Sequence, residues 1–336
     1  MRVLVTGGTG FLGAHVVRAH LARGWQVRCA VRATSPSLTL AGLDVERLEV
    51  DLADPDAIAH AMEGCDAVQH LAGVFDVGPG GRARMDALHV EATRRLCEAA
   101  LSRREPPRLV LCSTSATVAW GPYTNPADER APLGDLDTVY GHGETPYRAY
   151  IESKLAGEGV VRDYARRGLH ALIVNPDYVL GAWDLKPTSG ALLLAMAKYP
   201  IPMYPRGGKC FIDAEDCGLG HVLALERGQP GERYLLGVHN LSYRALMTAV
   251  ARQVGRRPPR LPLPRSLTSA ASSAAGTIQR LFPGRQAGLD PSVLLSMQAE
   301  RYRDGSRARR ELGLPVTPIE HSIAAALRWF RAHGYC

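Results

Sequence analysis

A glycine-rich turn directly after the first apolar run constrains this fold more than any other feature of the chain. Val3-Leu4-Val5 leads into Thr6-Gly7-Gly8-Thr9-Gly10-Phe11-Leu12-Gly13, and a helical pattern follows. Three of its glycines satisfy the spacing G-x-G-x-x-G. This spacing is needed where a turn is tight and where a helix meets a strand closely. A strand, a glycine turn and a helix in this order are typical of a parallel α/β sheet.

Short apolar runs alternate with helical patterns through the first half of the chain. Such alternation implies right-handed crossovers and a parallel sheet with helices on both faces. We therefore predict an α/β fold, a Rossmann doubly wound parallel sheet. The runs expected to form its strands are 3–5, 27–31, 47–50, 67–70, 109–112 and 171–174, and the stretches expected to form helices include 14–23, 56–63 and 85–102.

The glycine turn also predicts an anionic ligand. Free N–H groups and the dipole at a helix start favour the pyrophosphate of a dinucleotide. At the end of the second strand stands Arg32, where an NAD-binding chain usually carries an acidic residue that binds ribose hydroxyls. A guanidinium suits a 2′-phosphate better, and Thr34, Ser35 and Ser37 add hydroxyls. We predict a preference for NADP(H), with NAD(H), and a merely solvated Arg32, as the open alternatives.

The second half of the chain has a looser pattern. Prolines recur at 176, 187, 200, 202 and 205, and 258–264 is rich in proline. We predict that residues 1–175 form an NADP-binding Rossmann domain, with part of its sheet contributed by later strands near 209–240. Residues 176–336 would mostly form a smaller C-terminal substrate-binding cap domain.

Composition excludes several other classes. A chain of 336 residues with 46% hydrophobic residues can build a core without disulfides. Seven cysteines without a CxxC pair argue against a metal site and for reduced thiols in the cytoplasm. The net charge of +7 comes without a basic run interleaved with aromatics, so we expect no nucleic acid partner. Met1-Arg2 leads straight into the first strand and no window reaches ~18 apolar residues, so we expect neither signal peptide nor transmembrane segment.

A tyrosine and a lysine stand four residues apart in Tyr150-Ile151-Glu152-Ser153-Lys154, on one face of a predicted helix. A free phenol has a pKa near ~10, and a neighbouring ammonium would lower it toward the range useful for proton transfer. Ser115 follows the 109–112 strand, at the sheet edge where doubly wound folds bind ligands. We predict Tyr150 as general acid and base, Lys154 as the group that tunes it, and Ser115 as the donor that orients a carbonyl oxygen.

These motifs together resemble those of the extended short-chain dehydrogenases/reductases. The Tyr-x-x-Ser-Lys form, its distance from Ser115, and Arg32 are most similar to the dihydroflavonol reductase and 3β-hydroxysteroid dehydrogenase branch. The run 181–190 resembles bacterial proteins described as hopanoid-associated sugar epimerases. The resemblance runs through the whole chain and is most specific over 3–32, 109–121, 150–158 and 172–188.

The resemblance implies roles for a further set of residues. The glycine turn would bind the cofactor phosphates, the ends of the third and fourth strands would flank the adenine and line the cofactor, and 176–179 would place the nicotinamide. Ser115, Tyr150 and Lys154 match the family's catalytic triad. The expected cofactor-binding residues are Gly7, Gly10, Phe11, Leu12, Gly13, Arg32, Asp51, Leu52, Leu71, Ala72, Gly73, Tyr150, Lys154, Pro176 and Val179.

Three positions depart from the family pattern. His89 replaces an asparagine that is usual in the helix after the fourth strand, and it either relays a proton or packs. Sugar-nucleotide epimerases often have an arginine near 209 that reads a substrate phosphate and a histidine at 213. This chain has Lys209 and Asp213, which weakens the case for a nucleotide sugar.

Two segments are expected to shape the substrate pocket. Residues 261–285 place apolar side chains at helical spacing between arginines. Three interpretations are open for this segment: a helix packed on the core, a mobile lid, or an interfacial helix that rests on a membrane. Peripheral membrane contact is therefore one of the alternatives. A homodimer like that of many family members also stays open. The other segment is the long loop 120–148, with Trp120, Tyr123, Tyr140, His142 and Tyr147.

We expect an NADP(H)-dependent oxidoreductase that interconverts a ketone and a secondary alcohol on a bulky, mostly apolar or aromatic, lipophilic small molecule. The alternative is an NAD(P)-dependent (nucleotide-)sugar epimerase with a transient keto intermediate. A reductase consumes its cofactor in proportion to product, whereas an epimerase shows no net cofactor turnover. A third hypothesis, a non-catalytic nucleotide sensor or scaffold, has no need of the Ser115, Tyr150 and Lys154 set.

Overall fold

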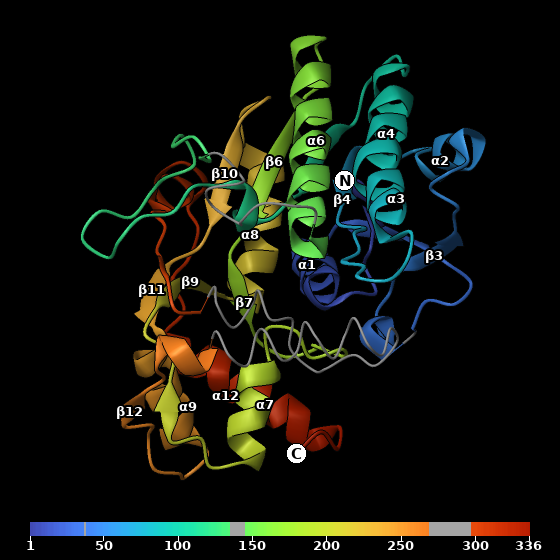
Figure 1. The fold of residues 1–336 in the computed structure, drawn as a ribbon. Helices are drawn as coiled ribbons and strands as arrows, with labels where there is room; N and C mark the ends of the chain where they lie inside the picture. Colours follow the sequence, from blue (N-terminus) through green and yellow to red (C-terminus); the bar gives the residue numbers. More distant parts are fainter. Residues whose placement is uncertain (37, 135–144, 269–296) are drawn as a thin grey trace.

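A seven-stranded parallel sheet forms the centre of the computed structural model, which describes residues 1–36, 38–134, 145–268 and 297–336 (Figure 1). The strand order is β10-β6-β5-β4-β1-β2-β3, and every neighbouring pair is parallel. This is the doubly wound order, with its reversal beside β1, so the predicted Rossmann sheet is confirmed. The strands are β1 (Arg2–Thr6), β2 (Gln26–Val31), β3 (Glu46–Glu49), β4 (Ala67–His70), β5 (Arg108–Cys112), β6 (Ala171–Pro176) and β10 (Arg233–Leu236).

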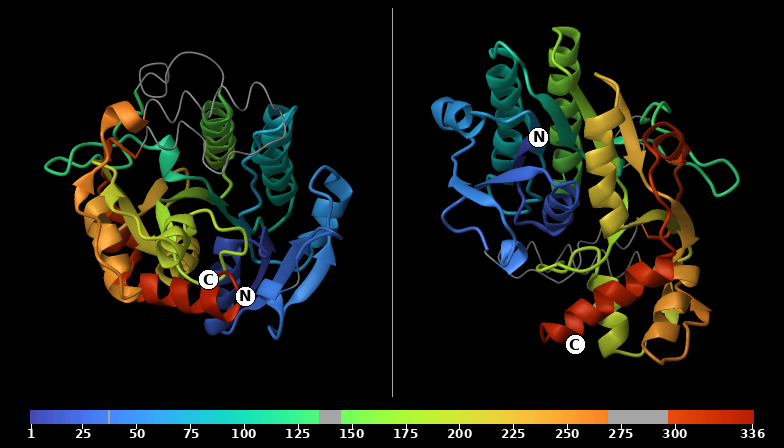
Figure 2. Two further views of the ribbon diagram at one scale, coloured as in Figure 1. Left: turned by 60° about the horizontal axis from the view of Figure 1, so that its bottom comes forward. Right: turned by 180° about the vertical axis from the view of Figure 1, so that it is seen from behind.

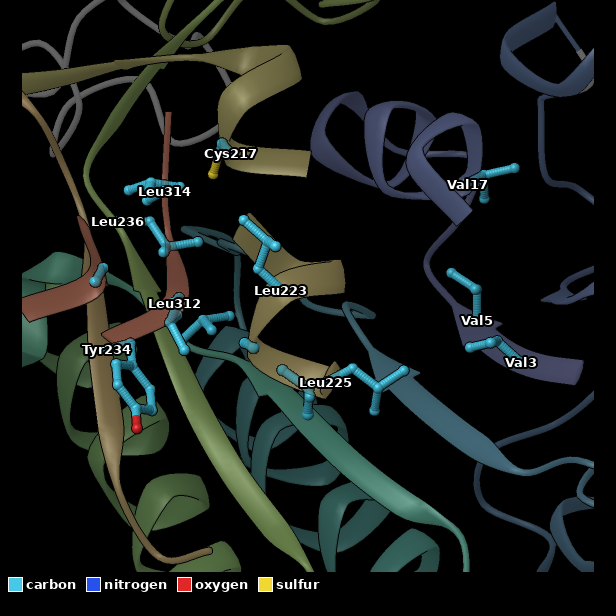
Figure 3. Close-up of a cluster of buried hydrophobic side chains, with 14 of the residues drawn as sticks. Val3, Val5, Val17, Cys217, Leu223, Leu225, Tyr234, Leu236, Leu312 and Leu314 are labelled. Carbon is cyan, nitrogen blue, oxygen red and sulfur yellow. The ribbon is translucent and has the colours of Figure 1, made fainter. Parts of the chain in front are cut away.

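Helices cover both faces of this sheet (Figures 1 and 2). One face carries α1 (Phe11–Ala22) and α8 (Ala214–Arg227), and the other carries α2 (Pro55–Ala61), α4 (Ala92–Leu101) and α6 (Pro146–Arg166). Side chains alternate across β1, so Val3 and Val5 join the first core and Leu4 joins the second. Figure 3 shows the first core, where Leu223 and Leu225 of α8 point toward the sheet. Burial on both faces explains why these strands read as continuous apolar runs.

The helix expected over 85–102 is divided into three parts. It consists of α3 (Gly81–Asp86), a π-helical segment η2 (Ala87–Glu91) and α4. The short 3-10 helix η3 (Ser115–Thr117) follows β5, and another, η1 (Leu38–Leu40), follows β2.

A second, smaller sheet lies beside the first. Pro176, which has no N–H to donate, ends β6, and the next strand begins at Tyr178 in the second sheet. The second sheet consists of β7 (Tyr178–Leu180), β9 (Gly208–Asp213), β11 (His239–Ser242) and β13 (Glu300–Arg301). We expected strands near 209–240 to extend the main sheet. Of these, β10 joins the main sheet, whereas β9 and β11 belong to the second sheet.

Three helices pack around this second sheet on a separate apolar core. They are α7 (Ala191–Lys198), α9 (Tyr243–Gln253) and α12 (Ile319–Ala332); the short strands β8 (Met203–Tyr204) and β12 (Leu261–Pro262) pair nearby, and the π-helical turn η4 (Ala308–Leu312) precedes α12. No helix among the described residues has the length and apolar character needed to cross a bilayer. Ser37, Tyr140, His142 and the part of 261–285 beyond residue 268 lie outside the described residues.

Candidate active site

The glycine turn after β1 holds three segments of backbone close together. Gly7 has a φ of +72°, and a Cβ there would stand 2.7 Å from the backbone of Leu71 and Ala72. A Cβ on Gly13 would collide with the carbonyl oxygen of Gly7, so neither position accepts a side chain. Gly10 begins α1 without a side-chain cap, and the first turn carries no acidic residue. The free N–H groups of this helix start can therefore bind an anion.

A cleft of about 500 Å³ opens beside this turn, at the carboxyl ends of β1, β2, β3 and β4. A tight turn built from glycines, next to a free helix start, fits the pyrophosphate of a dinucleotide. Phe11, Leu12 and Gly13 form the adjoining first turn of α1. Of the residues we expected to bind the cofactor, the cleft is lined by Gly7, Gly10, Arg32, Asp51, Leu52, Leu71, Ala72 and Gly73. It is also lined by residues that we did not expect there: Thr9, Ala33, Glu49, Val50, Val74 and Leu88.

Arg32 leaves the end of β2 at one end of this cleft. Its backbone N–H donates to the Ser35 hydroxyl at 2.9 Å, and both residues line the cleft. No described carboxylate forms an ion pair with the exposed Arg32 guanidinium. Glu49, at the end of the neighbouring β3, lines the same cleft.

Lys154 lies between the ends of β4 and β5. Thr145 caps α6, accepting from the N–H of Arg148 at 3.1 Å, and the helix carries the lysine into the interior. Its Nζ donates to the carbonyl oxygen of Cys112 at 3.1 Å, and a Cβ on Gly73 would stand 3.1 Å from the same atom. Burial lowers the pKa of Lys154. The ammonium therefore lies next to Gly73, one of the residues that line the cleft.

Tyr150 is surrounded by aromatic rings, one turn before Lys154. Its ring centroid is 5.6 Å from that of Phe75, 5.7 Å from that of His89 and 6.5 Å from that of Tyr147. Burial raises the pKa of Tyr150, and a hydrogen bond with the Thr114 side chain lowers it by less. The expectation of a lowered phenol pKa is therefore wrong for this structure, because desolvation of the phenolate outweighs every favourable contact.

Ser115 begins η3 and is buried. The hydroxyl that bonds with Tyr150 belongs to its neighbour, Thr114, which also accepts from the N–H of Ala116 at 3.2 Å. Sequence reasoning missed Thr114. The signal was present, since three consecutive hydroxyl residues follow β5.

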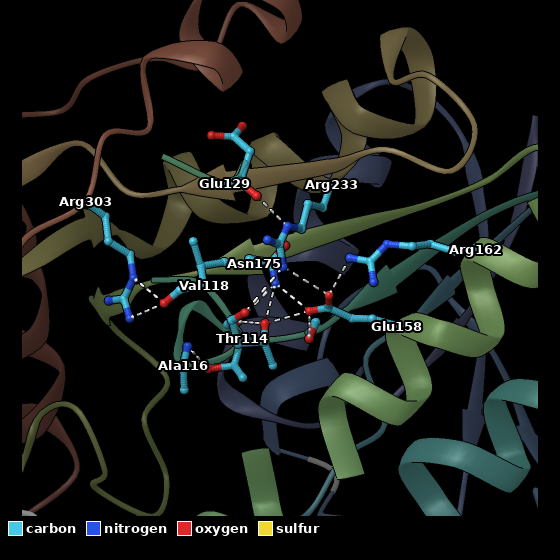
Figure 4. Close-up of polar contacts among 11 residues, drawn as sticks. Thr114, Ala116, Val118, Glu129, Glu158, Arg162, Asn175, Arg233 and Arg303 are labelled. Atoms are coloured by element: carbon cyan, nitrogen blue, oxygen red, sulfur yellow. Dashed lines mark hydrogen bonds and ion pairs between the residues drawn. The ribbon is translucent and has the colours of Figure 1, made fainter. Parts of the chain in front are cut away.

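A fully buried carboxylate fixes this loop to α6 (Figure 4). Glu158, one turn after Lys154, shows no side-chain exposure. Hydrogen bonds and ion pairs to its two oxygens join the segment that carries Thr114 and Ser115 to α6, the helix that carries Tyr150 and Lys154. One oxygen, Oε1, accepts from Ser113 Oγ (2.7 Å), Thr117 Oγ1 (2.6 Å) and Asn175 Nδ2 (2.8 Å), and the other, Oε2, lies 2.8 Å from Arg162 and 3.5 Å from Arg233.

The segment from Pro176 to Val179 links the two sheets. Pro176 is the last residue of β6 and Val179 lies within β7, both buried. Between them, Asp177 pairs with Arg303 at 2.8 Å and faces Lys209 at 3.9 Å. Burial lowers the pKa of Lys209 to about 8. Asp213 caps α8, accepting from the N–H of Glu215 at 2.7 Å, so it has a local structural role.

The described residues hold no group of three or more His, Cys, Asp or Glu placed for a metal ion. Comparison with known proteins matches residues 3–237 to the NAD dependent epimerase/dehydratase family. "Sterol demethylase protein B" of Methylococcus capsulatus is 32% identical, covering 99% of each chain. A 4-hydroxy-2-methyl-3-oxo-4-farnesyl-3,4-dihydroquinoline-1-oxide ketoreductase of Stigmatella aurantiaca is 27% identical, covering 93% of this chain and 91% of its own.

Among solved structures, a nucleoside-diphosphate-sugar epimerase from Pseudomonas aeruginosa superposes with a TM-score of 0.78 and 29% identity, over 100% of this chain and 99% of its own. The glycine cradle, the cleft and these matches agree with one another. The chain belongs to the NAD dependent epimerase/dehydratase family, the extended short-chain dehydrogenases/reductases.

Proposed function

We propose that this chain is an NADP(H)-dependent oxidoreductase that interconverts a ketone and a secondary alcohol on a bulky, mostly apolar or aromatic small molecule. The observation that carries the proposal is the position of Lys154. Its ammonium lies beside Gly73, which lines the cleft, and Lys154 follows Tyr150 by one helical turn. Carbonyl reduction needs a hydride carrier for the carbon and an acid for the oxygen. A phenol can serve as that acid, and a neighbouring ammonium favours its loss of the proton.

The residues of this chain handle the proton of the reaction. A bound nicotinamide would supply or accept the hydride at the carbon atom. Tyr150, whose pKa burial raises, stays protonated at neutral pH and donates to the carbonyl oxygen as negative charge develops there. Ser115 orients that oxygen, and Thr114 adds a second hydroxyl beside the phenol. The Lys154 ammonium stabilises the phenolate that forms after proton transfer.

Two features support an apolar substrate. Phe75, Tyr147 and Tyr150 bring three aromatic rings together at the site. Asp177 neutralises Arg303 and faces Lys209, which leaves less positive charge for a sugar diphosphate. The names of two relatives, which refer to a sterol and to a farnesyl-bearing dihydroquinoline oxide, agree with this class.

Replacing Tyr150 with Phe tests the mechanism. General acid help accounts for ~10²–10⁴ in rate, so Tyr150→Phe should lower kcat at least 100-fold and leave the NADPH dissociation constant within about twofold. Tyr164→Phe is the matched control, since its hydroxyl on the same helix bonds with Glu98 at 2.8 Å. NADPH consumption is measured with a ketosteroid and with a dihydroflavonol. Near-normal turnover by the Tyr150→Phe variant would refute the mechanism.

Replacing Arg32 with Asp tests the cofactor preference. A charge-assisted hydrogen bond to the 2′-phosphate stabilises by about 1.5–3 kcal/mol, so the ratio of kcat/KM for NADPH over NADH should fall at least tenfold. Arg47→Asp is the matched control, because Arg47 is an exposed residue of β3 outside the cleft lining. If this ratio is unchanged in the Arg32→Asp variant, Arg32 does not bind a 2′-phosphate, and the protein either prefers NAD(H) or does not distinguish the two cofactors.

The second candidate is a sugar epimerase. It is favoured by the similarity to a nucleoside-diphosphate-sugar epimerase over the full length of the chain. The two functions differ in cofactor balance. Purified protein incubated with UDP-glucose and the oxidised cofactor would invert a sugar carbon without accumulating reduced cofactor if it is an epimerase. A reductase leaves the sugar unchanged and oxidises NADPH only with a carbonyl compound.

A further inference from the structure

The second half of the sequence distributes its charged residues very unevenly. No Asp or Glu occurs over 185–212 or over 233–289, whereas these two stretches contain thirteen Lys and Arg residues. The net charge of the whole chain is +7, so the remainder of the chain is net negative. The positive charge of this protein is therefore concentrated in one part of the sequence.

The structure brings parts of these two stretches together on one surface. The carboxyl end of α7 and the segment between α9 and β12 enclose a shallow apolar cavity of about 620 Å³. Figure 1 shows these elements at the end of the molecule away from α2 and α4. Its lining has arginines and apolar residues and no carboxylate, and includes Tyr199, Ile201, Arg256, Arg257, Arg260 and Leu261. We call this surface the basic apolar face.

Two apolar side chains of this face project into solvent. Tyr199 is 64% exposed and Leu261 is 59% exposed, which is unusual for large apolar residues that lie side by side with arginines. Arg256 has a structural role, since it donates to the carbonyl oxygens of Ala197 and Lys198 at the end of α7.

The other two arginines of the face are available for a partner. Arg257 and Arg260 are exposed, and neither forms an ion pair or a side-chain hydrogen bond with a described residue. The sequence has no Asp or Glu from residue 233 to residue 289, on either side of these two arginines. Unpaired guanidinium groups around an exposed tyrosine and leucine match a surface with phosphates above an apolar layer.

We propose that the basic apolar face docks on an anionic phospholipid bilayer. Tyr199 and Leu261 would enter the boundary between headgroups and acyl chains, and Arg257 and Arg260 would bind lipid phosphates. A duplex nucleic acid offers the phosphates but has no apolar layer for the two projecting side chains. The docking itself is independent of the proposed reaction. A bilayer would serve as the source of an apolar substrate of the class proposed above.

Vesicle sedimentation with the full chain tests this inference. At ~0.1 M salt, the protein should bind vesicles of phosphatidylcholine with 30% phosphatidylglycerol and not vesicles of phosphatidylcholine alone. Near an anionic bilayer each arginine is worth about fivefold in affinity, so removal of both in Arg257→Gln/Arg260→Gln should weaken binding roughly 25-fold. Arg47→Gln/Arg104→Gln, an equal charge change on exposed residues elsewhere, should leave binding within about twofold.

A third variant separates the apolar contribution from charge. Tyr199→Ser/Leu261→Ser keeps every arginine and should weaken vesicle binding at least tenfold. Retention of NADPH binding by each variant establishes that it is folded. The proposal fails if the wild type does not bind the anionic vesicles, or if the double arginine variant binds like its control. It also fails if a DNA duplex binds more tightly than the vesicles with the same arginine dependence, which would assign a nucleic acid partner instead. Vesicle binding is read without turnover, so its failure leaves the proposed reaction untouched.

Discussion

His89 joins the loop after β4 to α6 through both of its ring nitrogens. Nε2 accepts from the backbone N–H of Val74 at 3.1 Å. Because an amide nitrogen only donates, the ring proton lies on Nδ1, which donates to Ser153 Oγ at 2.8 Å. Ser153 donates in turn to the carbonyl oxygen of Tyr150 at 2.8 Å. Burial lowers the pKa of His89 to about 2, so the ring is neutral at neutral pH, which favours a positioning role over a proton relay.

Two variants of His89 separate these roles. His89→Gln offers an oxygen to Val74 and an amide donor to Ser153, so we expect kcat to stay within about threefold of wild type. His89→Leu leaves the buried Val74 N–H unpaired, a loss of about 1–3 kcal/mol in the free energy of unfolding, and kcat should fall about tenfold. Neither variant should change the shape of the kcat profile between pH 5 and 8. Loss of an inflection near pH 6.5 in His89→Leu would show that His89 relays protons.

The residues that local pattern could predict are those whose role depends on their neighbours in the chain. The tight glycine turn and the placement of Tyr150 and Lys154 one turn apart on a helix are of this kind, because a turn or one helical repeat sets their geometry. Thr114 and Glu158 are of the other kind. Their roles depend on the packing of η3, β6 and α6, which no spacing in the sequence encodes. The raised pKa of Tyr150 was also out of reach, since desolvation depends on the packed surroundings.

At the scale of elements, the packing of α6 depends on a glycine that the structure singles out. A Cβ on Gly157 would collide with the carbonyl oxygen of His89 in η2. Gly159, two residues along the same helix, is exposed and has open space where its Cβ would be. The same substitution at the two positions should therefore have opposite effects.

Gly157→Ala should push α6 away from η2 and lower the free energy of unfolding by about 1–3 kcal/mol, as overpacking does. It should also lower kcat, because Tyr150 and Lys154 move with the helix. Gly159→Ala should raise the free energy of unfolding by up to about 1 kcal/mol, the difference in helix propensity. Urea unfolding of the two variants provides the measurement. Equal effects would mean that α6 is not held against η2.

The buried carboxylate of Glu158 offers a second test at this scale. Glu158→Gln replaces one carboxylate oxygen with an amide N–H₂ group, which can only donate. In one orientation this group faces the donors of Arg162 and Arg233. In the other it faces the groups that now donate to Glu158, those of Ser113, Thr117 and Asn175. We expect the free energy of unfolding to fall by about 2–4 kcal/mol.

Glu152→Gln is the matched control on the same helix. Glu152 pairs with Arg82 and Arg148 at a partly exposed position, so its loss should cost less than about 1 kcal/mol. A Glu158→Gln variant as stable as this control would show that the buried network stabilises the fold no more than the partly exposed pairs of Glu152 do.

At the scale of the whole molecule, alternation of strands and helices predicted the main sheet because each crossover returns the chain to a neighbouring parallel position. The second sheet could not be predicted in this way. Its strands are short and lie far apart in sequence, and β9 pairs with three segments that begin at residues 178, 239 and 300. The pairing of these strands depends on the packing of α7, α9 and α12, because these helices share one apolar core with the second sheet.

Buried neutral histidines also give the whole molecule a specific sensitivity to acid. Burial lowers the pKa of His20, His70 and His221 to about 3, and that of His89 to about 2. In the unfolded chain each titrates near ~6.5. Below that pH the unfolded state binds protons that the folded state excludes. Each histidine therefore removes about 1.4 kcal/mol of stability for every pH unit down to the folded pKa.

We expect the free energy of unfolding, measured with urea at pH 8, 7, 6.5, 5.5 and 5, to change little between pH 7 and 8 and to fall steeply from about pH 6.5. Carboxylates alone would delay that fall until about pH 4.5, because they begin to protonate only there. His221→Gln should make the slope shallower by about one histidine's share, whereas His60→Gln, an exposed control with a side chain 68% accessible, should leave it unchanged. Stability that stays level down to pH 4.5 would mean that these four rings take up protons inside the folded protein, and that its interior opens to water more easily than the packing of both cores indicates.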